Sequence, residues 1–212
     1  SGDLIKIFSA SDEIDEAAFV VETIEHHVSE NYKRSEVAIL YRSNAQSRIF
    51  EEKFVSKGIP YKIYGGFRFF ERAEIKDVIA YMRLATSNDD DNSFERIVNT
   101  PPRGIGEKTK NLLREFSKEK EISLFKSIPL ALEESILSKK AGESLSKFCN
   151  LINIISSILE KDDLPHQINE IIKVSNIKSI YEKNKTEQSR SKLENLDELI
   201  SAAQEFVNTD LD

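Results

Sequence analysis

The feature that most constrains the fold is a change of pattern along the chain. Three short apolar runs, residues 4–8, 37–40 and 60–64, lie in the first third of the sequence. Between them, apolar residues recur at intervals of three and four, as on one face of an α-helix. Strand, helix, strand, helix, strand is the order typical of a parallel α/β sheet. We therefore expect the three runs to be strands of one sheet.

After residue 70 only helical patterns remain. The predicted helices cover residues 71–85, 94–98, 107–119, 124–133, 139–159, 165–175 and 192–207. The expected fold class is α/β followed by all-α, with a partial parallel sheet in residues 1–95 and a helical domain in residues 96–212. Sheets usually carry about four to six strands. Because only three are predicted, we expect the chain to be a fragment of a longer protein.

Composition excludes several classes of protein. No apolar run approaches the roughly 20 residues that span a bilayer, so we expect no membrane partner. The single cysteine, Cys149, cannot form an internal disulfide and fits a reducing, cytoplasmic location. His26 and His27 are adjacent and would point about 100° apart on a helix, so no metal site is expected. The net charge of −7 argues against a uniformly basic surface but leaves room for local basic patches.

Tyr41 and Arg42 follow the second apolar run directly. Ligands of open α/β sheets bind beyond the carboxyl ends of the strands. A tyrosine ring can stack on a base, and a guanidinium can bind a phosphate, so the pair suits a nucleotide. The alternative is a strand end with a half-buried tyrosine and a surface arginine.

The third run leads into a stretch rich in glycine, phenylalanine and arginine, residues 65–77. Phe67, Phe69 and Phe70 beside arginines could stack on the bases of single-stranded nucleic acid. Alternatively, Phe69 and Phe70 are core anchors. The sequence contains no Gly-x-x-x-x-Gly-Lys-Ser/Thr phosphate loop, so the chain cannot hold a complete nucleotide-hydrolysing site.

A second glycine-containing stretch precedes the predicted helix at residues 107–119. Backbone N–H groups of a Gly-Ile-Gly hairpin and the positive end of a helix dipole suit a phosphate. Positive side chains nearby would contact a DNA backbone without reading its sequence. The residues of this candidate site are Arg103, Gly104, Ile105, Gly106 and Lys108. The alternative is a tight turn that needs glycine for a positive φ.

Further lysines of the helical part are candidate DNA contacts. Lys147 lies on one predicted helix, and Lys173 and Lys178 flank a turn at Asn176. Asparagine tolerates the left-handed conformation that such a turn requires. Both groups of lysines could instead be solvated helix faces.

The sequence resembles a known family at several places. Residues 39–48, Ile-Leu-Tyr-Arg-Ser-Asn-Ala-Gln-Ser-Arg, resemble motif IV of the UvrD/PcrA/Rep helicases of superfamily one. Residues 63–77 and 99–106 resemble the two blocks that follow in that family, and residues 195–199 resemble its Glu-Asn-Leu-Glu-Glu-Leu segment. The resemblance covers essentially the whole chain, in the family's order and spacing.

The resemblance implies an ATP-driven enzyme that unwinds DNA in the 3′-to-5′ direction, in repair or replication. This chain would hold the first part of the second RecA-like motor domain, residues 1–95, and the N-terminal part of its helical accessory domain, residues 96–212. Its partners would be a single-strand/duplex DNA junction and the remainder of the helicase chain. The isolated fragment is expected to be inactive.

The resemblance also assigns roles to residues. Tyr41 would stack on the adenine of ATP, and Arg42 would act as the catalytic arginine that reaches the γ-phosphate. The Gly104–Gly106 turn and the basic helices would meet duplex DNA; at Asn176 the family often has glycine. Mg²⁺ would be bound by parts of the protein outside this chain.

Two other classes of function compete with this one. The helical part could act alone as a non-catalytic DNA-binding or protein-docking module. A small-molecule α/β enzyme is the third class, but the sequence offers no acid–base or nucleophile constellation for it.

Overall fold

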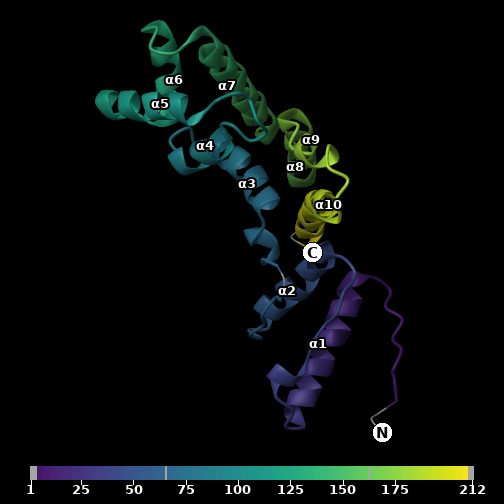
Figure 1. Ribbon diagram of the computed structural model, residues 1–212. Helices are drawn as coiled ribbons and strands as arrows, with labels where there is room; N and C mark the ends of the chain where they lie inside the picture. The colour runs from purple at the N-terminus through teal and green to yellow at the C-terminus, as the bar shows by residue number, and fades with distance from the viewer. Residues whose placement is uncertain (1–3, 65, 162, 210–212) are drawn as a thin grey trace. The chain divides into compact units, whose positions relative to one another are not determined.

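Helices form all the regular secondary structure of residues 4–64, 66–161 and 163–209, which the computed structural model describes (Figure 1). The predicted fold class is therefore wrong, because these residues are all-α and contain no β-strand and no RecA-like sheet. None of the helices in this part of the chain has the length and apolar character needed to span a bilayer. Gly65, in the glycine pair after the third predicted strand, lies outside the described residues.

The three predicted strands are non-helical segments without strand partners. Within the described residues, no backbone hydrogen bond joins residues 4–8, 37–40 and 60–64 to one another. A strand obtains its hydrogen bonds only from a neighbouring strand, whereas a helix makes its own. The apolar pattern showed which segments could pair, but it did not show whether a pairing partner was present. The most exposed aliphatic side chains of the described residues, each 92–94 % accessible, lie on these segments: Leu4, Ile5, Ile7 and Leu40.

The chain divides into two compact units, Ser1–Glu71 (unit 1) and Arg72–Asp212 (unit 2). These units are defined by internal contacts, and the predicted division of motor and accessory domains at residue 95 stays a prediction. The helical elements of unit 1 are α1 (Glu13–Ser29), η1 (Arg34–Glu36), η2 (Asn44–Gln46), α2 (Ser47–Ser56) and η3 (Phe69–Glu71).

Unit 1 has a small core between α1 and α2. Asp12 caps the N-terminus of α1, where its carboxylate accepts the Asp15 N–H at 2.8 Å. Gly58, with φ of +64°, follows α2 and ends it, as glycine commonly does at the C-terminus of a helix. The buried residues of this core are Ala17, Val21, Ile24, Phe50, Phe54 and Ile59.

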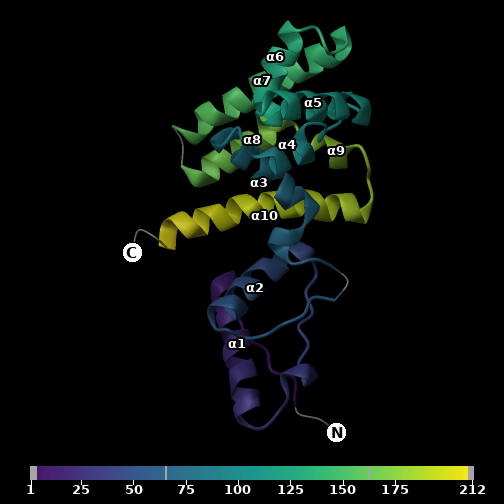
Figure 2. The same cartoon turned by 90° about the vertical axis from the view of Figure 1, so that its left-hand side faces the viewer.

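Unit 2 is a helical bundle in which α3 (Ala73–Thr86) and α7 (Lys139–Leu159) pack against each other and against several further helices. Its other elements are α4 (Asp91–Ile97), α5 (Glu107–Lys120), α6 (Leu124–Glu133), α8 (Leu164–Ser175), α9 (Ser179–Glu182) and α10 (Glu187–Thr209). Helix α3 contacts α4, α7, α8 and α10, and α7 contacts α3, α6 and α8. Figure 2 shows α10 running along α3 and α8, in agreement with their contacts.

The helices of unit 2 were largely predicted by the sequence. The predicted bounds of α6 and α7 agree with the structure, and those of α5 and α8 differ by one residue. The Asp90 carboxylate caps α4, where it accepts the Ser93 N–H at 3.0 Å, and the helix begins at Asp91 rather than at the predicted Phe94. Ser93 itself is buried.

A buried polar bridge connects the first residues of unit 2 to its last helix. Arg72 Nη1 donates to Asn195 Oδ1 at 2.7 Å, and Asn195 Nδ2 donates to Glu74 Oε1 at 2.6 Å. All three side chains are less than 9 % exposed. Since buried polar groups need partners, one carboxamide satisfies a guanidinium on one side and a carboxylate on the other. The bridge fixes α10 against the start of α3.

Candidate functional site

The segment that leads into η2 and α2 alternates between partly buried and exposed residues. Val37 and Ile39 pack against the core of unit 1, and Tyr41 is half-buried in the same pattern. Leu40 and Arg42 are exposed. Successive side chains of an extended backbone point to opposite sides. The burial pattern therefore places Tyr41 and Arg42 on opposite sides of the segment.

Gln46 holds the backbone of this segment. Its Oε1 atom accepts the N–H groups of Arg42 and Ser43, each at 3.0 Å, and Ser43 Oγ accepts the Ala45 N–H at 3.4 Å. This reciprocal capping satisfies N–H groups at the start of the helix. It fixes the backbone that carries Arg42, while the Arg42 guanidinium has no ion-pair or hydrogen-bond partner among the described residues.

This geometry distinguishes the two predicted nucleotide contacts. Arg42 presents a charged, exposed guanidinium on a fixed backbone, which suits an anion such as a phosphate. Tyr41 leaves only part of its side chain accessible, on the other side of the segment. The arrangement supports Arg42 as a phosphate contact more strongly than it supports Tyr41 as a base-stacking residue. Both roles stay predictions.

Glu51 connects three parts of unit 1 and was missed in the sequence. Its carboxylate accepts the Ser47 hydroxyl at 2.7 Å, the Tyr61 hydroxyl at 3.3 Å and the Phe69 N–H at 3.2 Å. Burial, followed by the nearby Glu51 charge, raises the pKa of Tyr61. The Ser47–Glu51 spacing of four on a helix could have indicated the first contact. The contact with Phe69 spans 18 residues and follows no sequence rule.

The predicted Gly-Ile-Gly site is a turn stabilised from within unit 2. Gly104 has φ of +76°, so the turn needs glycine there. This agrees with the alternative interpretation of the stretch as a tight turn. Asn99 Oδ1 accepts the N–H groups of Arg103 at 2.8 Å and Ile105 at 3.1 Å. Ile105 is fully buried, whereas Gly104 and Gly106 are exposed. The buried Ile105 side chain anchors the turn in the core.

Arg103 uses its guanidinium inside the protein. Nη1 donates to the carbonyl oxygens of Ile97 at 3.0 Å and Pro101 at 3.1 Å, and Nη2 donates to the Tyr81 hydroxyl. The guanidinium carbon also lies 5.4 Å from the centre of the Phe148 ring. Burial raises the pKa of Tyr81 to about 12, which keeps its hydroxyl protonated. These contacts give Arg103 a role in holding the turn before α5.

The positive charge predicted around α5 is partly neutralised. Arg114 pairs with Glu95, with Nη2 2.7 Å from Oε2, and Lys110 pairs with Glu107. Lys108 is exposed and has no ion pair in the described part of the chain. Of the positive side chains predicted to meet DNA near this turn, Lys108 is the best placed to do so.

The other candidate lysines lie on different helices of unit 2. Lys147 is exposed on α7, Lys173 pairs with Glu170 at 2.6 Å, and Lys178 pairs with Asp197 at 2.6 Å. Asn176 adopts the predicted left-handed conformation, with φ of +57°. Figure 1 shows α5 beside α6 and apart from α8 and α9, so the structure does not gather the candidate DNA residues into one patch.

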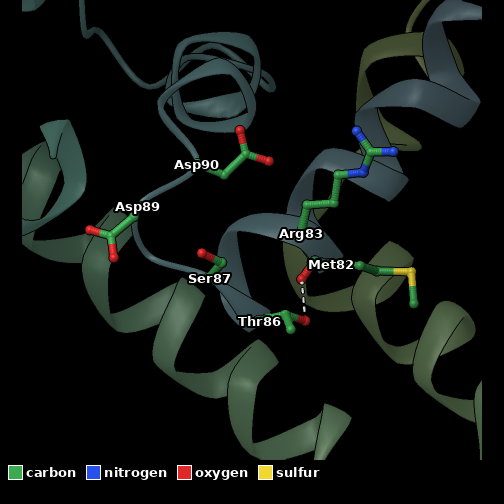
Figure 3. Close-up of a pocket in the computed structure, with 6 residues that line it drawn as sticks. All are labelled: Met82, Arg83, Thr86, Ser87, Asp89 and Asp90. Atoms are coloured by element: carbon green, nitrogen blue, oxygen red, sulfur yellow. Dashed lines mark hydrogen bonds between the residues drawn. The ribbon is translucent and has the colours of Figure 1, made fainter.

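An open pocket at the C-terminal end of α3 carries two carboxylates. Figure 3 shows the Asp89 and Asp90 carboxylates pointing in different directions. Asp89 pairs with Lys126 at 2.6 Å, and Asp90 caps α4. Among the described residues, no group of three histidine, cysteine, aspartate or glutamate side chains could hold a metal ion. The two carboxylates of the pocket therefore have structural roles, one in an ion pair and one in capping a helix.

Comparisons with known proteins give one consistent result. The family described as UvrD-like helicase C-terminal domain matches residues 1–212. The chain is 43 % identical over 209 residues to DNA helicase II of Haemophilus influenzae, covering 99 % of this chain and 29 % of that protein. It is 41 % identical over 205 residues to DNA helicase II of Escherichia coli, covering 97 % of this chain and 28 % of that protein. It is 38 % identical over 213 residues to ATP-dependent DNA helicase PcrA of Staphylococcus epidermidis, covering 100 % of this chain and 29 % of that protein. The chain thus spans less than a third of these relatives.

Proposed function

This chain belongs to the UvrD-like helicase family, and we propose that the longer protein containing it is an ATP-dependent DNA helicase. The proposal includes 3′-to-5′ unwinding at a junction of single-stranded and duplex DNA, in repair or replication. It is supported by similarity over the whole chain to relatives named DNA helicase II and ATP-dependent DNA helicase PcrA. Residues 1–95 would belong to the second motor domain and residues 96–212 to its accessory domain.

The observation that carries the proposal for this chain is the Arg42 guanidinium. It is exposed, positively charged and unpaired among the described residues, and Gln46 fixes its backbone. Charge develops on the phosphoryl oxygens during ATP hydrolysis, and a fixed guanidinium stabilises it. We assign Arg42 to the γ-phosphate of ATP. Tyr41 would contact the adenine through the accessible part of its ring.

The remainder of the nucleotide site would come from other parts of the longer protein. This sequence has no phosphate loop. The described residues offer no cluster of carboxylates for Mg²⁺. We therefore expect residues 1–212 alone to hydrolyse no ATP, and DNA-stimulated hydrolysis by this fragment would contradict the shared-site proposal.

The test of Arg42 uses the full-length protein. Arg42→Ala is expected to lower ATP turnover by about 10³- to 10⁵-fold, as loss of an arginine finger does, and to weaken ATP binding less. Arg42→Lys keeps a charge but loses the planar fork, and we expect it to restore turnover only in part. Arg34→Ala is the matched control, because Arg34 is also exposed in unit 1. Unchanged turnover in Arg42→Ala would remove Arg42 from the mechanism.

A second candidate function is a non-catalytic DNA-binding or docking module formed by unit 2. The exposed Lys108 at the start of α5 favours DNA as its ligand. Affinity of full-length protein for duplex DNA should fall steeply with salt, and Lys108→Ala should reduce the slope of log K against log salt by about 0.9. Duplex binding without any ATP hydrolysis by the full-length protein would favour this module over the helicase.

A further inference from the structure

Three aromatic rings near the end of unit 1 are exposed to solvent. Tyr64 is 82 % exposed, Phe67 is 70 % exposed and Phe70 is 49 % exposed. Their neighbour Phe69, by contrast, is 1 % exposed. Burial of aromatic rings is strongly favourable, so several accessible rings in one short stretch indicate an interaction site.

The buried member of this stretch anchors the exposed ones. The Phe69 N–H donates to both oxygens of the Glu51 carboxylate at 3.2 Å, which fixes the stretch to α2. The Phe70 ring packs edge-on against Phe69, with centroids 5.1 Å apart and planes at 87°. Phe70 is therefore held on a fixed support while half of its surface stays accessible.

Positive side chains alternate with these rings. Lys62 Nζ lies 4.9 Å from the centre of the Tyr64 ring, and the Arg68 guanidinium carbon lies 5.1 Å from the centre of the Tyr61 ring. Both Lys62 and Arg68 are exposed. Over residues 61–71 the only acidic residue is Glu71, although the whole chain carries a net charge of −7. The stretch is locally basic on an acidic chain.

We propose that Tyr64, Phe67 and Phe70, together with Lys62 and Arg68, form a stacking surface for single-stranded DNA. Rings that accept any base and cations that accept phosphates are the two components of binding without sequence preference. The exposed cations beside the rings favour a partner that carries both negative charge and flat apolar groups, and single-stranded nucleic acid carries both along its whole length. This inference rests on the proposed helicase function and names a contact with its substrate that Arg42 and the lysines of unit 2 do not supply.

The test measures binding of the full-length protein to oligothymidylate and to an abasic strand of equal length. Tyr64→Leu and Phe70→Leu keep apolar bulk but lose the aromatic face, and each should weaken oligothymidylate binding by about 5- to 100-fold. Abasic-strand binding should change little. Tyr64→Phe keeps the ring and should retain wild-type affinity. Phe206→Leu is the matched control, since Phe206 is 60 % exposed on α10.

Two results would overturn the proposal. Equal losses on the abasic strand and on oligothymidylate would show that the rings do not stack on bases. Unchanged oligothymidylate affinity, with a lowered melting temperature in the leucine variants, would show that the rings pack beneath the rest of the longer protein. The cations have a separate readout: Lys62→Ala and Arg68→Ala should each reduce the salt slope by about 0.7.

Failure of this inference can be told from failure of the proposed function. ATP hydrolysis by the wild-type protein tests the helicase and does not depend on these rings. Hydrolysis with wild-type oligothymidylate binding in all the leucine variants would retain the helicase and reject the stacking surface. Ring-dependent binding without hydrolysis would retain the surface and reject the helicase.

Discussion

Unit 1 and unit 2 differ in how completely each buries its own large apolar side chains. In unit 1, Leu4 and Leu40 are 92 % and 94 % exposed on extended segments that lack strand partners. In unit 2, the most exposed large apolar side chain among the described residues is Phe206, at 60 %. A helix closes its hydrogen bonds within one segment, whereas a strand depends on a neighbour. The helices of unit 2 therefore bury their apolar side chains without further partners, whereas the extended segments of unit 1 leave theirs exposed.

The interior of unit 2 offers the largest expected effect. Phe148 is fully buried on α7 and contacts the rings of Phe94 and Phe125. Phe148→Ala should lower the free energy of unfolding by about 3–5 kcal/mol, through lost burial and the cavity left behind. Urea unfolding of residues 1–212 followed by circular dichroism measures it. Ile154→Ala on the same helix is the control, because Ile154 is 51 % exposed; equal losses in the two variants would contradict a closed interior.

The buried polar bridge should give a smaller effect. Asn195→Ala removes both the acceptor of Arg72 and the donor to Glu74. Leaving buried polar groups with fewer partners should cost about 2 kcal/mol in the same unfolding experiment. Asn153→Ala, at an exposed position of α7, should change stability by less than about 0.5 kcal/mol. A neutral Asn195→Ala variant would show that the bridge does not hold α10 in place.

The extended segment of unit 1 should give the smallest effect. Leu40→Ser should change the stability of residues 1–212 by less than about 0.5 kcal/mol, since Leu40 is 94 % exposed. The same substitution in the full-length protein measures whether other parts of the protein cover this side chain. A large loss in residues 1–212 themselves would mean that unit 1 buries Leu40 and would remove the contrast between the units.

The sequence predicted the helices and turns well, but it did not predict whether the apolar runs would pair as strands. Helical spacing located α6 and α7 correctly, and glycine and asparagine marked the positive-φ positions at Gly104 and Asn176. The strands failed because an apolar run does not reveal whether its partner is present. Arg42 could be identified as a candidate from its position after an apolar run, but the support from Gln46 became evident only in the structure.

The aromatic stretch shows the same limit. Both Phe69 and Phe70 could be interpreted as core anchors, yet Phe69 is buried and Phe70 is half-exposed. The Glu51 carboxylate that accepts the Phe69 N–H is 18 residues away along the chain. Contacts of that range are set by tertiary packing, which no spacing rule on one sequence encodes.

The hydrogen bond between Arg72 and Asn195 joins positions 123 residues apart at the start and near the end of unit 2. Loop-closure entropy rises only with the logarithm of loop length, by about 0.6 kcal/mol per doubling. A loop of this length therefore costs only slightly more to close than one half as long, provided that a contact holds its two ends together. The Arg72–Asn195–Glu74 bridge does so. It ties the start of α3 to α10, so hydrogen bonds within unit 2 hold its first and last helices to each other.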